Sequence, residues 1–203
     1  MKLLISIFLC CWAWTAYAQK TALPVVNIDK LPTTTDEFIA LRNNIATTPQ
    51  GGAAVWVVAA IIYSQNPILG RQCLIIASDK SLLSAAATGY QGFDFGKSTD
   101  YLVKQLDSKK YVPNSYVIGT SPDTGYALGQ TPYQVACFTN PYSGNEAEGK
   151  IKVFVKCTGA DTDRPMTLVK NEKGHWKAVE FSSLVVGIRP PKQKSKGAAE
   201  GDF

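Results

Sequence analysis

Hydrophobic residues recur every three to four positions in the segment 35–46, which is the spacing of one face of an α-helix. The apolar members of this pattern are Phe38, Leu41 and Ile45. Thr34 and Glu37 stand just before it in the spacing of a capping box. The pattern therefore predicts an amphipathic helix from Thr35 to Ala46.

The next stretch is apolar on every side, with no charged residue between Arg42 and Arg71. Thr48–Pro49 is typical of a helix start, and residues 53–63 are too few to cross a membrane. This pattern predicts a central helix that is buried on most sides. Asn66–Pro67 begins a third helix, and the short link between the two predicts an antiparallel helical hairpin.

After residue 111 the apolar positions alternate with polar ones, which is the period of a β-strand with one solvent-exposed face. In the clearest case Ile151, Val153 and Val155 share one face, and lysines occupy the other. The four residues 171–174 have the composition of a hairpin loop. Strands are predicted at residues 115–119, 133–139, 150–158, 165–170, 175–181 and 184–188.

Between the helices and these strands, residues 87–97 alternate glycine with aromatic residues and predict a loop or an irregular strand. A short helix over 99–106 follows. Because the helices precede the strands, the predicted fold class is α+β, with an N-terminal helical layer packed on a C-terminal antiparallel β-sheet. One domain is predicted over 31–191, with an extended lead-in over 19–30 and a disordered basic tail over 192–203.

The first 18 residues have the layout of a secretory signal peptide. Met1–Lys2 is a short basic start, Leu3–Trp14 is uncharged and apolar, and Ala16–Tyr17–Ala18 provides the small residues of a cleavage site. The apolar run is too short to span a bilayer. We therefore expect export to the periplasm or the extracellular space, and a mature chain that starts near Gln19 without a transmembrane segment.

The formal net charge of +5 is modest and lies partly in the two ends of the chain. Nucleic-acid-binding proteins carry basic residues clustered on one face, so no nucleic-acid partner is expected. Three cysteines remain after the predicted signal peptide, namely Cys73, Cys137 and Cys157. Cys137 and Cys157 lie in two predicted strands and are the one plausible disulfide pair, although the sequence favours three buried free thiols.

The sequence offers little catalytic chemistry. His175 is the only histidine, and neither a Gly-x-Ser-x-Gly elbow nor a Ser-x-x-Lys pair occurs. A clustered set of zinc ligands and a phosphate-binding glycine loop are also missing, so we expect no metal and no cofactor. A hydrolase that uses two carboxylates stays open, because such a pair can be far apart in the chain.

Four aromatic residues in segments rich in glycine, proline, serine and asparagine are the candidate binding residues: Tyr90, Phe93, Phe95 and Tyr142. Exposed rings can stack on sugar faces or hold peptides, and the alternative is that they fold back over the core. The predicted export and the scarcity of catalytic motifs favour a non-catalytic binding or assembly module at the cell envelope. Its expected partner is a glycan or an envelope protein. A structural protein that oligomerises through an apolar patch is a further alternative.

Several motifs together resemble a bacterial family that is classed as a domain of unknown function. They are Asp36–Glu37–Phe38 with Leu41–Arg42, Thr48–Pro49 with Gly51–Gly52–Ala53, Asn140–Pro141–Tyr142–Ser143–Gly144, and Ser182–Ser183–Leu184–Val185–Val186–Gly187 with Arg189–Pro190–Pro191. The resemblance implies a single domain over 31–191 and a bacterial source. It implies no activity, cofactor or site residue.

Overall fold

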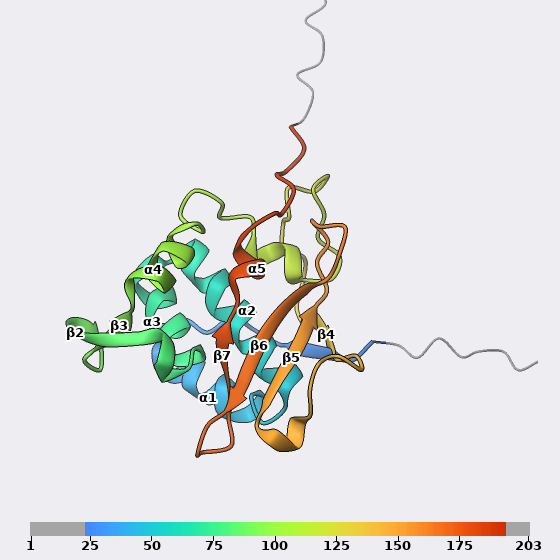
Figure 1. The fold of residues 1–203 in the computed structure, drawn as a ribbon. Helices are drawn as coiled ribbons and strands as arrows, with labels where there is room; N and C mark the ends of the chain where they lie inside the picture. The colour runs from blue at the N-terminus through green and yellow to red at the C-terminus, as the bar shows by residue number, and fades with distance from the viewer. Residues whose placement is uncertain (1–22, 194–203) are drawn as a thin grey trace, which may run out of the picture.

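Helices from the first half of the chain pack on one face of a five-stranded antiparallel sheet (Figure 1). This computed structural model describes residues 23–193, and the predicted signal peptide and most of the predicted tail lie outside them. The predicted fold class, α+β with an N-terminal helical layer on a C-terminal antiparallel sheet, is confirmed. The α-helices are α1 (Thr35–Ile45), α2 (Pro49–Gln65), α3 (Pro67–Ala77), α4 (Lys97–Lys104) and α5 (Ser182–Val185).

Each of the first three helices begins at a side chain that caps its free N–H groups. Thr34 Oγ1 accepts a hydrogen bond from the Glu37 N–H at 3.2 Å, and Thr48 and Asn66 do the same for α2 and α3. Residues 51–63 of α2 are all buried, because α1, α3 and the sheet surround this helix. The predicted central helix is therefore present. No helix within residues 23–193 has both the length and the apolarity needed to cross a membrane.

The sheet has the strand order β1-β4-β5-β6-β7. Its strands are β1 (Val25–Ile28), β4 (Tyr133–Phe138), β5 (Lys150–Val155), β6 (Arg164–Lys170) and β7 (Trp176–Glu180). On β5 the predicted apolar face, Ile151, Val153 and Val155, is buried, whereas Lys150 and Lys152 are exposed. β1 belongs to the segment predicted as a lead-in, and it pairs with β4 at one edge of the sheet.

The helical layer and the sheet approach each other most closely where α2 crosses β7. A Cβ atom at Gly52 would lie 2.6 Å from Trp176 Cβ, so only glycine fits this position. One turn further along α2, the centroids of the Trp56 and Phe181 rings lie 4.7 Å apart. This contact holds α2 against the β7 edge of the sheet, next to the end of α3.

Two predicted strands are wrong. Residues 115 and 116 belong to a 3₁₀ turn (Pro113–Tyr116), and 117–119 continue as a bend and a turn. Pro113 fixes the first backbone angle of the 3₁₀ turn, and Ser115 Oγ donates back to the Val112 carbonyl at 2.7 Å. Residues 184–188 contain the end of α5 and a turn at Gly187, whose φ is +69°. In both segments only some of the apolar side chains that suggested a strand are buried, among them Tyr116 and Val117 in the first and Leu184 and Val185 in the second, whereas Ile118 and Val186 are exposed.

The glycine- and aromatic-rich segment forms a second, two-stranded sheet. β2 (Leu83–Tyr90) and β3 (Phe93–Phe95) pair as a hairpin that projects away from the main sheet, at the left of Figure 1. Gln91 and Gly92 both have positive φ, which is the backbone of a tight hairpin turn. The pairing of the hairpin is irregular between Ala85 and Tyr90, in agreement with the irregular strand predicted over this segment.

Candidate ligand-binding cavity

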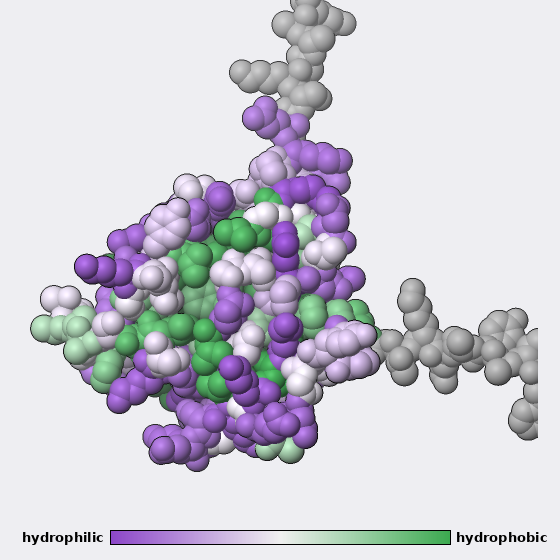
Figure 2. All heavy atoms as spheres, viewed as in Figure 1, coloured by the Kyte–Doolittle hydropathy of each residue, from purple (hydrophilic) through white to green (hydrophobic). Residues whose placement is uncertain are grey.

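A cavity of about 490 Å³ lies where α1, the end of α3, the β2–β3 hairpin and the turn between β6 and β7 meet. This volume is within the range of small-molecule sites. Figure 2 shows hydrophobic residues reaching the surface between the projecting hairpin and the sheet, with hydrophilic residues along the lower border. The cavity therefore combines apolar walls with a polar rim.

Two of the predicted binding aromatics, Tyr90 and Phe93, line this cavity from the hairpin, and both are half-buried. Lys80 extends over the Phe93 ring, with its Nζ 5.2 Å from the ring centroid. The structure does not bring the other two to the cavity. Phe95 is buried in the core, and Tyr142 is 89% exposed and is not among the residues that line the cavity.

The cavity is strongly basic. Four cationic side chains line it against one carboxylate, that of Asp79. The four are Arg42 from α1, Lys80 after α3, Lys173 in the hairpin turn and Lys177 from β7. None of them has an ion-pair partner within residues 23–193. This set leaves a net positive charge for an incoming ligand.

Lys177 is the most perturbed of these groups. The pKa of Lys177 is lowered to about 8, chiefly by burial and secondly by repulsion from Arg42, while Asp79 opposes the shift. Its Nζ donates a hydrogen bond to the Ile76 carbonyl at the C-terminal end of α3, where a helix favours a positive charge. One N–H of the ammonium is used in this way, and the others are available to the cavity.

Polar atoms without partners adjoin the basic groups. Ser78, which lines the cavity, is 2% exposed, and its Oγ has no hydrogen-bond partner in the described part of the chain. The His175 Nδ1 is buried and equally without a partner among residues 23–193. Burial lowers the pKa of His175, and Arg42, Lys177 and Lys173 lower it further. The lowered pKa favours the neutral form of His175 beside the cationic cluster.

A partly buried charge network fixes the hairpin that carries the aromatic wall. Arg71 of α3 donates from Nε to Asp94 Oδ1 at 2.9 Å on β3 and from one Nη to Asp100 Oδ1 at 2.6 Å on α4. The Arg71 and Asp94 side chains are each 27% exposed. Because the hairpin lies outside the main sheet, this network is its principal polar attachment to the helical layer.

The opposite wall is positioned by the turn between β6 and β7. Asn171 Oδ1 accepts hydrogen bonds from the backbone N–H groups of Lys173 and His175 at 3.1 and 2.9 Å. Gly174 has a φ of +80°, which allows the sharp turn that the sequence predicted. The turn places Lys173 and Lys177 at the cavity.

A second, smaller cavity of about 220 Å³ is lined by Asp29, Lys30 and Glu37 among others. Lys30 Nζ donates to Glu37 Oε1 at 2.8 Å, and the Thr33 N–H donates to Oε2 at 2.7 Å. These bonds lower the pKa of Glu37 to about 2, with the Lys30 hydrogen bond as the largest cause. Glu37 is thus held as a carboxylate that is already paired.

The cysteines contribute no site. Cys73, Cys137 and Cys157 are each a buried free thiol, so the structure does not contain the disulfide considered between Cys137 and Cys157. Burial raises the pKa of Cys73 and of Cys137 to about 12. Within residues 23–193, no group of three or more histidine, cysteine or carboxylate side chains is gathered where it could hold a metal ion.

Sequence reasoning found the aromatic wall and missed the basic one. Arg42 resembled an ordinary solvent-facing helix residue. Lys177 carried no local signal either, since a strand residue between buried Trp176 and Ala178 is expected to face solvent. What joins these residues is tertiary structure between distant segments.

Residues 23–193 thus form an α+β fold with a basic, aromatic-lined cavity beside the helical layer. The chain belongs to the family described as Domain of unknown function (DUF6935), whose model matches residues 30–192. No curated protein and no solved structure matches it.

Proposed function

We propose that this protein is an exported, non-catalytic binding module of the bacterial cell envelope, and that it takes its ligand in the cavity between α1, α3, the β2–β3 hairpin and the β6–β7 turn. One observation carries the proposal: Tyr90 and Phe93 share a cavity with basic side chains that have no carboxylate partner within residues 23–193. Rings supply contact area at low entropic cost, and unpaired charges favour a ligand of opposite sign.

A carboxylate-dependent hydrolase is the alternative, and the cavity supports it less well. Hydrolysis of a glycosidic bond uses two carboxyl groups about 5–10 Å apart, one of them with a raised pKa. The large cavity is lined by one carboxylate, Asp79. In the smaller cavity the pKa of Glu37 is lowered, which is the opposite of what a general acid needs.

Thermal unfolding against a panel of envelope polysaccharides, glycan fragments and peptides tests the binding function. A ligand at about one hundred times its Kd stabilises the folded state by roughly 2.7 kcal/mol, so Tm should rise with one class. The paired substitution Tyr90→Ala with Phe93→Ala should remove that rise. Tyr142→Ala is the matched control, because Tyr142 is 89% exposed and lies outside the cavity lining.

Mass spectrometry of the ligand after prolonged incubation separates binding from catalysis. We expect the ligand to be recovered unchanged. Cleaved product that disappears in an Asp79→Asn or Glu37→Gln variant would support the hydrolase instead. No stabilisation by any class, with the double variant equal to the wild type, would count against the cavity as a binding site.

A further inference from the structure

We propose that the cavity binds a sugar unit that carries a carboxylate, as in a uronic acid, with the carboxylate against Arg42 and Lys177 and the sugar ring against Tyr90 and Phe93. This inference rests on the proposed binding function and names the class of ligand. Three features of the cavity support it: its charge, its unsatisfied polar groups and its flat apolar surfaces.

The charge of the cavity favours an anion. Arg42 donates from Nε to Asn43 Oδ1 at 2.9 Å, which leaves the outer edge of its guanidinium for a second acceptor. Arg42 and Lys177 are both half-buried, and they lie close enough for their charges to interact. Two cations held together in a partly buried site repel each other, and an anion between them removes that repulsion. A guanidinium matches the two oxygens of a carboxylate.

The polar groups favour a ligand with hydroxyls. Ser78 Oγ is buried and has no partner in the described residues, and a polar atom left in this state costs stability until a ligand supplies one. Asp79 also lines the cavity, as the one carboxylate among the cations; its Oδ1 accepts from the Ser81 N–H at 2.9 Å, and among the described residues its Oδ2 is left for a donor. A carboxylate ligand without hydroxyl groups would bring no donor for Asp79, whereas a sugar acid supplies both charge and hydroxyl groups.

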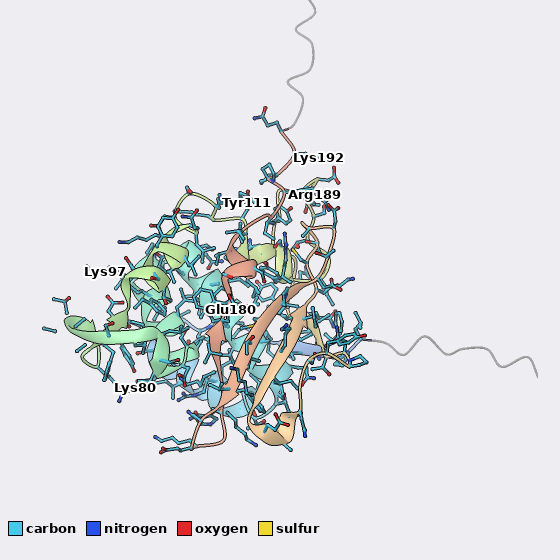
Figure 3. The ribbon with its side chains drawn as sticks, in the orientation of Figure 1. Lys80, Lys97, Tyr111, Glu180, Arg189 and Lys192 are labelled. Atoms are coloured by element: carbon cyan, nitrogen blue, oxygen red, sulfur yellow. The ribbon has the colours of Figure 1, made fainter. Side chains whose placement is uncertain are left out.

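The apolar surfaces favour a ring over a flexible chain. Tyr90 and Phe93 come from the two sides of one tight turn, and Ile75 and Ile76 at the end of α3 add aliphatic surface. The C–H face of a pyranose ring packs on such surfaces. Lys80, whose Nζ lies over the Phe93 ring, is positioned at the rim (Figure 3). It provides a further cation to a neighbouring unit of an acidic chain.

Calorimetric titration of the purified full chain with three matched saccharides tests the inference. The probes are trigalacturonate, its fully methyl-esterified form and neutral galactotriose. Trigalacturonate should bind at least tenfold more tightly than either uncharged probe, and its affinity should fall as salt is raised. The ester comparison needs no variant, so it stays decisive even where a substitution impairs folding.

Variants locate the site. Arg42→Gln and Lys177→Met should each weaken trigalacturonate binding by roughly tenfold or more, since each removes a charged hydrogen bond to the carboxylate. Lys97→Gln is the matched control. Lys97 is exposed, lies outside the cavity lining and extends from the opposite side of the hairpin to Lys80 in Figure 3. Its loss should leave the affinity unchanged.

The remaining outcomes separate this inference from the proposed function. Benzoate and inorganic phosphate serve as further probes. If one of them binds in a manner that depends on Arg42 and trigalacturonate does not, the acidic-sugar inference is overturned and the binding function stands. If trigalacturonate and its ester bind equally, the charge argument is wrong. If none of the five probes binds and the earlier ligand panel also produces no stabilisation, both proposals are overturned.

Discussion

Lys177 shows how one side chain serves both the fold and the cavity. Its pKa in the folded protein is about 8, below the ordinary lysine value of 10.5, chiefly because it is buried and secondly because Arg42 repels it. Between these two values the unfolded chain holds a proton that the folded chain has released. The free energy of unfolding therefore gains a contribution that rises with pH across this interval.

Replacing Lys177 by methionine should remove that contribution. We expect the difference in unfolding free energy, wild type minus Lys177→Met, to become more positive as pH is raised from 7 to 10. Urea unfolding at a series of pH values measures it, with Lys97→Gln expected to follow the wild type. Cys73 and Cys137, whose pKa values are raised to about 12, act in the opposite sense above pH 9, but they do so equally in both proteins. A difference that stays constant with pH would contradict the assignment.

At the scale of elements, the β2–β3 hairpin depends on Arg71. This side chain joins α3 to Asp94 on the hairpin and to Asp100 on α4. Arg71→Met should lower the free energy of unfolding by about 1.5–3 kcal/mol, the scale of hydrogen bonds to charged groups. It should also speed amide exchange of residues 83–95 more than that of the main sheet, as hydrogen–deuterium exchange mass spectrometry can measure.

The control for the hairpin prediction is Lys104→Gln. Lys104 contacts the same Asp100 at 2.7 Å, but its side chain is 60% exposed and pairs within one helix. Such a pair contributes only about 0.3–0.5 kcal/mol. If the two variants change exchange in residues 83–95 to the same extent, Arg71 does not hold the hairpin.

The packing of α2 against α3 depends on Gly70. A Cβ atom at this position would collide with the backbone of Tyr63, so alanine forces the two helices apart. Gly70→Ala should cost about 1–3 kcal/mol of unfolding free energy, as overpacking of a core does. Gly129→Ala is the control, because a Cβ there meets no atom within 4 Å. If urea unfolds both variants at the same midpoint, the helices adjust to the added methyl group without a loss of unfolding free energy.

The elements that sequence reasoning predicted well are those with strong local signals. The caps at Thr34, Thr48 and Asn66 mark three helix starts, and the alternation in β5 marks a strand. The segments around Ser115 and Leu184 were misjudged, because a short apolar run looks the same in a strand and in one buried turn. There the outcome depends on tertiary contacts, such as the hydrogen bond from the Tyr116 hydroxyl to the Leu184 carbonyl at 2.8 Å.

The cavity was predictable only in part, for a related reason. Tyr90 and Phe93 carry a local signal, since aromatic residues beside glycines indicate an exposed hairpin or loop. Arg42 and Lys177 come from opposite ends of the chain and meet because Trp176 packs at Gly52 of α2, which brings β7 beside the helical layer. Phe95 lies two residues after Phe93 and therefore on the same side of β3, yet it is buried in the core, where Arg71 of α3 lies over its ring.

At the scale of the whole molecule, the proposal that the protein is exported rests on its N-terminal sequence. Cleavage after Ala18 would leave the sheet intact, because its first strand, β1, begins at Val25. The full chain expressed in a bacterial host should therefore yield an exported product that begins at Gln19 by mass spectrometry. Replacing Ala16 and Ala18 by arginine should block cleavage, since both positions need small residues.

Thiol titration provides an independent measurement of whether the signal peptide has been removed. Cys10 and Cys11 lie in the predicted signal peptide, so the denatured exported product should titrate as three thiols, whereas the uncleaved chain has five cysteines. In the native product Cys73 and Cys137 should stay unreactive at pH 8, because both are buried and their pKa values are about 12. An intact N-terminus with five thiols would contradict export by cleavage. Since the binding proposal depends on the cavity alone, its test would still stand, and only the envelope as the place of action would have to be given up.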